Sequence, residues 1–160
     1  MGADSRDNSG VVAPPPPIYG AGIALGLAAY WLAPLPLWPA GVASGPRWTT
    51  GAVLFAAAGL LAAWAMLRFS RAGTPVPTWR PTTALVVEGP YRFSRNPIYV
   101  ALSLAYASLG IGFDNAWLLA LLAPVLAVVR YGVVAREERY LEQRFGDDYR
   151  RYKARVRRWL

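Results

Sequence analysis

Four long apolar stretches, almost free of charge, alternate with polar segments along the chain. They cover residues 18–38, 49–67, 97–113 and 115–135. A helix needs about 20 apolar residues to cross the hydrocarbon core of a bilayer. The pattern therefore predicts an all-α integral membrane protein with four transmembrane helices.

The polar segments divide the rest of the chain. Residues 1–17 are polar and proline-rich, which predicts a disordered N-terminal tail. Residues 18–160 are expected to form a single membrane domain, with a binding loop over 83–99 and interfacial helices over 136–160. A very short turn joins the last two apolar stretches, so these should form an antiparallel hairpin.

Prolines and glycines add detail to the first two apolar stretches. Pro34, Pro36 and Pro39 should kink or end the first helix near its far side. In the second stretch, Gly51 and Gly59 should let a neighbouring helix approach closely.

A cleaved signal peptide is the alternative interpretation of the first stretch, because Val42-Ala43-Ser44 resembles a small-residue cleavage site. The segment before it lacks the basic region that such peptides carry, which favours a retained helix.

The basic residues are distributed unevenly, and the formal net charge is +8. The tail beyond Arg130 is basic, and the second loop also holds five arginines: Arg68, Arg71, Arg80, Arg92 and Arg95. Four spans place that loop and both termini on one face, which the positive-inside rule makes cytoplasmic. We expect a bacterial inner-membrane protein whose partners are membrane lipids and not nucleic acid.

The stretch from Thr83 to Tyr99 is more specified than a linker between helices needs to be. Gly89-Pro90 favours a tight turn, and Arg92 and Arg95 supply two cations. Asn96 is a favoured N-cap, and Pro97 would then be the first helical residue of the third span. The combination predicts half of a binding site.

The tail predicts two further helices. The first should stop at Gly146, and Asp147 or Asp148 can cap the second. The second helix should have an aromatic and apolar face, formed by Tyr149, Tyr152, Val156 and Trp159. Its other face is basic and consists of Arg150, Arg151, Lys153, Arg155, Arg157 and Arg158. We expect this helix to lie on the inner leaflet with its aromatic side toward the membrane.

The sequence has neither histidine nor cysteine. This excludes disulfides, thiolate metal sites and every nucleophile that depends on histidine, and no metal site is expected. Catalysis must then use positioning together with carboxylate, arginine, tyrosine or amide groups.

The candidate polar residues near the cytoplasmic face are Glu137, Glu138 and Arg130. The two acids leave the fourth span opposite Arg92 and Arg95, although a solvated helix face is the simpler interpretation. Glu138 is a candidate for substrate orientation or proton acceptance. Arg130 either orients an anionic substrate group or extends its side chain to the lipid headgroups.

Two motifs carry a resemblance to a known family. G-P-Y-R-F-S-R-N-P-I-Y is followed about forty residues later by E-E-R-Y-L-E-Q-R-F-G-D-D-Y-R-R-Y-K-A-R-V. Together, and in this order, they resemble the isoprenylcysteine carboxyl methyltransferases and the wider group of small membrane methyltransferases that includes phospholipid N-methyltransferases. The resemblance covers about Thr74 to Val156.

The resemblance implies S-adenosylmethionine as methyl donor, with S-adenosylhomocysteine as product, bound at the cytoplasmic face beneath the C-terminal helices. The donor-binding residues that it implies are Thr83, Ala84, Leu85, Val86, Tyr91, Arg95, Asn96, Pro97, Tyr99 and Glu137. Thr83 and Asn96 stand where the family often has histidine. The family's substrate arginine falls on Val133, and Arg130 is one helical turn earlier.

Methyl transfer from a sulfonium needs donor and acceptor to be held at near-attack distance, and it needs no covalent enzyme intermediate. A lipophilic or prenylated acceptor with a carboxylate is favoured, because a carboxylate needs no base. The alternatives are a phospholipid amine N-methyltransferase, a nicotinamide-dependent sterol-type reductase, and a non-catalytic lipid-binding scaffold.

Overall fold

The computed structural model describes residues 13–75 and 82–160, and over these ranges every regular element is helical. The expected N-terminal tail falls mostly outside the described residues, but Pro15–Pro17 form the first turn of the first helix. The elements are α1 (Pro15–Leu32), α2 (Ser44–Arg71), η1 (Gly89–Arg92, a 3₁₀ helix), α3 (Pro97–Gly112), α4 (Ala116–Val128), η2 (Val129–Val134, a π-helical segment), α5 (Ala135–Phe145) and α6 (Asp147–Arg155).

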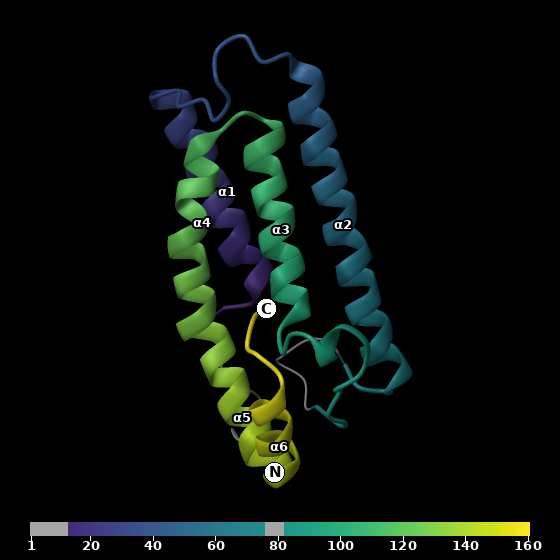
Figure 1. Cartoon of the computed structure of the whole chain (residues 1–160). Helices are drawn as coiled ribbons and strands as arrows, with labels where there is room; N and C mark the ends of the chain where they lie inside the picture. Colours follow the sequence, from purple (N-terminus) through teal and green to yellow (C-terminus); the bar gives the residue numbers. More distant parts are fainter. Residues whose placement is uncertain (1–12, 76–81) are drawn as a thin grey trace.

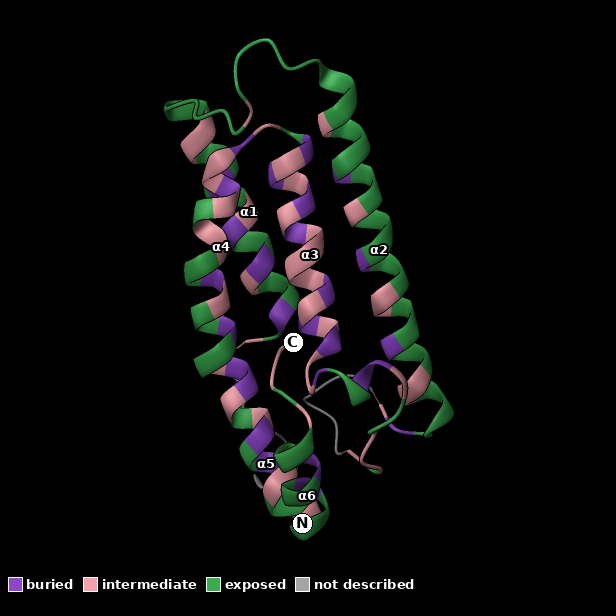
Figure 2. Ribbon diagram, viewed as in Figure 1, coloured by how far each residue is buried: buried purple, intermediate pink, exposed green. Residues whose placement is uncertain are grey.

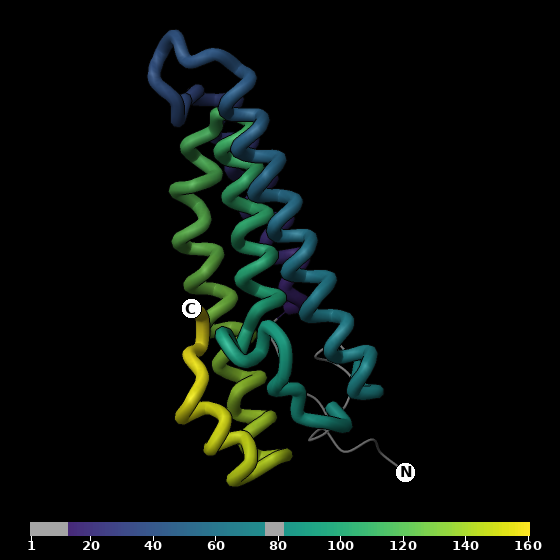
Figure 3. Tube along the Cα trace, turned by 45° about the vertical axis from the view of Figure 1, so that its right-hand side comes forward, coloured from purple at the N-terminus to yellow at the C-terminus, as the bar shows by residue number. Residues whose placement is uncertain are grey.

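The long helices lie side by side, and the polar elements gather at one end (Figure 1). Helix α3 packs along α2 on one side and against α4 and α1 on the other, and α1 also packs against α4. The binding loop, α5 and α6 all lie beyond the same end of this bundle (Figures 1 and 3).

Two helices of the described chain are long and apolar enough to cross a membrane. They are α2 and the continuous helix Ala116–Phe145, and only 17% and 28% of their most apolar windows are buried. Large apolar side chains such as Leu60 and Val128 instead face outward, along helices that are largely exposed (Figure 2). Outward apolar faces are typical of lipid contact and not of a soluble core.

The helices of the structure agree in part with the four expected transmembrane spans. α1 carries no charge, but it ends at Leu32 and not near residue 38, because Pro34 and Pro36 cannot continue the helix. α3 has 16 residues and is the shorter apolar helix of the bundle. That α1 and α3 also cross the bilayer stays a prediction.

Asp114 closes the end of the bundle opposite to the binding loop. Its carboxylate accepts hydrogen bonds from the backbone amides of Leu37 and Trp38 at 2.8 and 2.9 Å, and it pairs with Arg47 at 2.8 Å. The amide of Trp38 is the largest of the influences that lower the pKa of the Asp114 carboxyl. One side chain thus ties the α1–α2 connection to the turn between α3 and α4.

The buried core lies between α1, α3, α4 and η2. It consists of Tyr19, Tyr99, Tyr106, Leu118, Val125, Val129, Val133 and Val134. The η2 segment joins α4 to α5 without a break, and it carries the last three of these valines into the core.

The tail forms the two expected helices, with two differences in where and how they begin and end. α5 ends at Phe145, where Gly146 takes a positive φ of 53°, as predicted. Neither Asp147 nor Asp148 caps α6, since both pair with the arginines three residues later. The helix ends at Arg155, before Val156 and Trp159.

The expectation that the aromatic side of α6 faces the membrane is wrong. Tyr149 and Tyr152 are buried within the protein, at 1% and 5% exposure. The Tyr152 hydroxyl donates to the Tyr91 carbonyl oxygen at 2.7 Å. The aromatic face of α6 therefore packs on the binding loop.

The close approach of α2 to α3 can be tested with two glycines of the same helix. A Cβ added at Gly51 would lie 2.9 Å from the Gly112 Cα and 3.0 Å from the Ser108 carbonyl oxygen. Because backbone must move to make room, we expect Gly51→Ala to destabilise the protein by about 1–3 kcal/mol. The measurement is the thermal unfolding midpoint in detergent.

Gly59→Ala is the matched control, because no atom of the described residues lies within 4 Å of the added Cβ, contrary to the expectation that Gly59 also admits a neighbouring helix. This variant should unfold at the wild-type temperature or above it, since alanine favours the helix. Equal midpoints for the two variants would show that α2 and α3 are not in close contact at Gly51.

Candidate functional site

A cavity of about 270 Å³ lies where the binding loop meets α5 and α6. Its volume is near the lower end of the range for small-molecule sites, about 300–1,000 Å³. Besides these elements, its lining includes Pro15 and Pro16 from α1, Phe69 from α2 and Leu102 from α3. Most of its surface is apolar, and the ends of α1, α2 and α3 contribute to it.

Nine of the ten expected donor-binding residues line this cavity: Ala84, Leu85, Val86, Tyr91, Arg95, Asn96, Pro97, Tyr99 and Glu137. Thr83 does not. It is exposed, and its amide and hydroxyl are bonded to Thr74 Oγ1 and to the Gly73 carbonyl oxygen, at 3.0 and 3.3 Å. Thr83 therefore holds the loop to the end of α2.

Helix α5 fixes the start of the loop at Thr82, which also lines the cavity. Arg144 Nε donates to the Thr82 carbonyl oxygen, and the Thr82 amide donates to the Tyr140 hydroxyl at 3.2 Å. These contacts hold residues 84–86 against α5 although the segment has no regular secondary structure.

Tyr91 is buried in the short helix η1, which begins at Gly89. Gly89 has a φ of 62°, and Arg68 lies so close that a Cβ there would be 2.7 Å from its Nε. The Tyr91 ring packs edge-on against Phe69, with ring centres 5.4 Å apart. Burial raises the pKa of the Tyr91 hydroxyl, which keeps it protonated.

Glu137 presents its carboxyl group to the cavity. Tyr99 donates its hydroxyl hydrogen to Glu137 Oε1 at 2.7 Å. Glu137 lies in α5, a helix with six charged residues that begins beyond the apolar part of the fourth long helix. Burial raises the pKa of Glu137 from 4.5 to about 7, although the Tyr99 hydrogen bond lowers it. This carboxyl can therefore exchange a proton near neutral pH.

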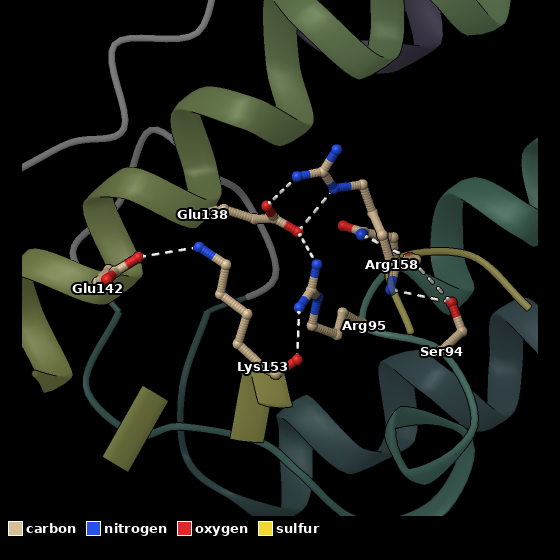
Figure 4. Close-up of polar contacts among 7 residues, drawn as sticks. Ser94, Arg95, Glu138, Glu142, Lys153 and Arg158 are labelled. Atoms are coloured by element: carbon tan, nitrogen blue, oxygen red, sulfur yellow. Dashed lines mark hydrogen bonds and ion pairs between the residues drawn. The ribbon is translucent and has the colours of Figure 1, made fainter. Parts of the chain in front are cut away.

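Glu138 is held in a different way (Figure 4). Arg158 binds both of its oxygens, with Nε 3.0 Å from Oε1 and Nη2 2.7 Å from Oε2. Arg95 Nη2 lies 2.8 Å from Oε1, so one negative charge sits between two positive charges. Arg95 thus lies opposite the acids as expected, whereas Arg92 is exposed.

Two expectations about this cluster need correction. Asn96 does not cap α3 through its side chain; its Nδ2 instead donates to the Arg158 carbonyl oxygen at 2.9 Å. Arg158 was expected on the basic face of a helix, but it lies beyond the end of α6 and pairs with Glu138. A helical pattern extended past Arg155 concealed this role.

Arg130 is not brought to the cavity. Its side chain is exposed on η2 and stacks on the ring of Tyr131, with Cζ 5.5 Å from the ring centre. This placement suits the interpretation in which Arg130 reaches the headgroup region.

The sequence interpretation missed several lining residues: Pro15, Pro16, Phe69, Tyr140, Tyr149 and Tyr152. The tyrosines of α6 were recognised as one face, but were assigned to lipid. Their burial depends on the fold of the loop onto α6, which no local pattern reveals.

Comparison with known proteins decides the family. A model of the family described as "Phospholipid methyltransferase" matches residues 46–148, well over half of the chain. The chain belongs to the phospholipid methyltransferase family. This confirms the resemblance carried by the two motifs and makes the protein a member of a family of membrane methyltransferases.

A protein of Haemophilus influenzae gives a second match. It is 45% identical over 65 residues, which is 39% of this chain and the whole of that protein. Its name is "Uncharacterized protein", so the match carries no function.

The raised pKa of Glu137 predicts a pH dependence of stability. The folded protein binds this proton more tightly than the unfolded chain, so the stabilising effect is complete below about pH 4.5. It is lost as the pH rises through about 7. Wild-type thermal midpoints should fall over this window relative to those of Glu137→Gln, which has no proton to lose. If the thermal midpoints of the two proteins changed in parallel with pH, the raised pKa assigned to Glu137 would be wrong.

Proposed function

We propose that this membrane methyltransferase uses S-adenosylmethionine and transfers its methyl group to a lipophilic acceptor at the cytoplasmic face. The observation that carries the proposal is the cavity itself, which gathers nine of the ten expected donor-binding residues and the Glu137–Tyr99 pair. Membership of the methyltransferase family supports the reaction class.

The lining suits the methyl donor chemically. S-adenosylmethionine brings an electrophilic methyl group on a sulfonium, together with an ammonium, ribose hydroxyls and an adenine ring. Glu137 offers a carboxylate for a cation or a hydroxyl, and Tyr91, Tyr149 and Tyr152 offer aromatic surfaces. Ala84 to Val86 add an aliphatic wall. Tyr99 fixes the direction of the Glu137 carboxylate before any ligand arrives.

The acceptor is proposed to enter from the bilayer, because the cavity is bounded by the ends of apolar helices. Ile98 and Leu102 of α3 lie in its wall beside Phe69 of α2. These side chains can hold an alkyl chain while its polar end reaches Glu137. Water exclusion by this apolar wall also protects the methyl donor from hydrolysis.

A carboxylate acceptor, as in an isoprenylcysteine-like lipid, remains the first choice because it is already a nucleophile. The pKa of about 7 at Glu137 favours a second candidate, the amine of a phospholipid. An ammonium must lose a proton before it attacks, and Glu137 is a proton acceptor of suitable strength. The absence of histidine therefore does not count against an amine.

Donor binding is tested by calorimetric titration of the detergent-purified protein with S-adenosylmethionine and S-adenosylhomocysteine. Wild type should bind both, and Glu137→Ala should lose about tenfold or more in affinity, since hydrogen bonds to charged groups contribute about 1.5–3 kcal/mol. Tyr99→Phe should bind more weakly than wild type. Arg157→Ala is the control and should bind normally, because its side chain is exposed.

No binding of either ligand by wild type would reject the donor and leave a nicotinamide-dependent reductase or a lipid-binding scaffold. Nicotinamide cofactors, titrated next, would separate those two.

The acceptor is identified with methyl-labelled donor and two vesicle preparations, one with phosphatidylethanolamine and one with a prenylcysteine lipid. A carboxyl methyl ester releases its label as methanol in base, whereas an N-methyl group keeps it. We expect labelled lipid from one preparation only. Base-stable product from the amine lipid would overturn our preference for a carboxylate.

A further inference from the structure

The last five residues, 156–160, leave α6 and run back along the lower part of α4; we call them the C-terminal strap (Figures 1 and 3). The strap lies outside residues 46–148, the part of the chain that matches the methyltransferase family. Sequence patterns placed it on a lipid-facing helix, but its contacts are with the cavity wall.

Three consecutive loop residues bind the strap backbone. The Arg95 amide donates to the Arg157 carbonyl oxygen at 2.9 Å. Ser94 Oγ and Asn96 Nδ2 both donate to the Arg158 carbonyl oxygen, at 3.4 and 2.9 Å. The strap is therefore joined to the segment that also supplies Arg95 and Asn96 to the cavity lining.

The strap is anchored again beyond Arg158. The Trp159 side chain packs against the buried core of the bundle. With its backbone held on one side and its tryptophan on the other, Arg158 has little freedom to leave Glu138. Its guanidinium contacts both carboxylate oxygens, a geometry that a single amine cannot reproduce (Figure 4).

Glu138 needs this partner because it is buried, with a side chain only 7% exposed. A buried carboxylate that loses a partner keeps the cost of desolvation without the compensating attraction. Of the two carboxylates that line the cavity, Glu138 is thus fully paired, whereas Glu137 is bonded to the neutral hydroxyl of Tyr99.

We propose that Arg158 is a positioning residue of the methyl-donor site. It fixes Glu138 within an ion-paired cluster, so that Glu137 alone offers a carboxylate to the donor. It also closes the strap over the Ser94–Asn96 segment. The proposal rests on the proposed function, because it assigns Arg158 a role in donor binding without contact to the donor.

The primary test compares neighbouring arginines of the strap. Arg158→Gln should weaken binding of S-adenosylhomocysteine about tenfold or more in a calorimetric titration of the full-length protein. Arg157→Gln should stay within about twofold, because its contribution is a backbone carbonyl that the substitution retains. Equal affinities for the two variants would overturn the proposal.

A second pair of variants guards against simple misfolding. Arg158→Lys restores the charge but not the two-oxygen contact, so its affinity should fall between those of wild type and Arg158→Gln. Glu138→Gln combined with Arg158→Gln should bind no more weakly than Arg158→Gln alone, because the carboxylate that Arg158 no longer binds has been removed. If the losses of binding free energy caused by Glu138→Gln and Arg158→Gln simply added in the double variant, Arg158 would not act through Glu138.

Failure of the proposed function would be recognised separately. If wild type binds neither S-adenosylmethionine nor S-adenosylhomocysteine, the donor assignment fails, and with it the role of Arg158 in donor binding. The Arg158–Glu138 contact would then be examined through thermal midpoints of the same single and double variants. If the midpoint shift of the double variant differs from the sum of the two single shifts, the contact has a purely structural role. If the shifts add, the two side chains do not interact, and the contact itself is rejected.

Discussion

One buried carboxylate organises the polar end of this protein. Glu138 lies on α5, and its two oxygens are shared by Arg95 from the loop and Arg158 from the chain terminus. These three segments are far apart in the sequence and share no secondary structure. Because an unpaired charge at this depth is costly, the folded cavity depends on these three segments being held together.

The two adjacent acids in this cluster, Glu137 and Glu138, have different partners and different roles. Glu138 is neutralised by guanidinium groups, whereas Glu137 accepts a hydrogen bond from a tyrosine and titrates near neutrality. The same short sequence, Glu-Glu, thus supplies one carboxylate that is held between two guanidinium groups and one that is bonded to a tyrosine. Burial and partners, and not residue type, decide which is which.

Much of this could be predicted from the sequence. Long apolar stretches and the prolines at their ends indicated the helices, and Gly146 marked the end of α5. The loop residues that line the cavity were located because the two motifs are specific. Local patterns failed where tertiary contacts decide the outcome. Tyr149 and Tyr152 have the spacing of a lipid-facing stripe, and only the folded loop shows that they are covered.

Arg158 was missed for a related reason: it was assigned to a helix that in fact ends three residues earlier, at Arg155. Asn96 likewise has the residue type and the position of a cap, yet its amide group is turned toward the strap, where Nδ2 donates to the Arg158 carbonyl oxygen.

The π-helical segment between α4 and α5 affects the direction, around the helix axis, in which Glu137 and Glu138 point. A π turn contains one residue more than an α turn, and each residue of an α-helix advances by about 100°. The lipid-facing side of α4 therefore cannot be extrapolated into α5 on an ideal helical wheel. Through η2, α5 takes a rotation that an ideal continuation of α4 would not give, and in this rotation Glu137 and Glu138 line the cavity. The exposed apolar side of α4 and the cavity-lining side of α5 can thus be oriented independently within one continuous helix.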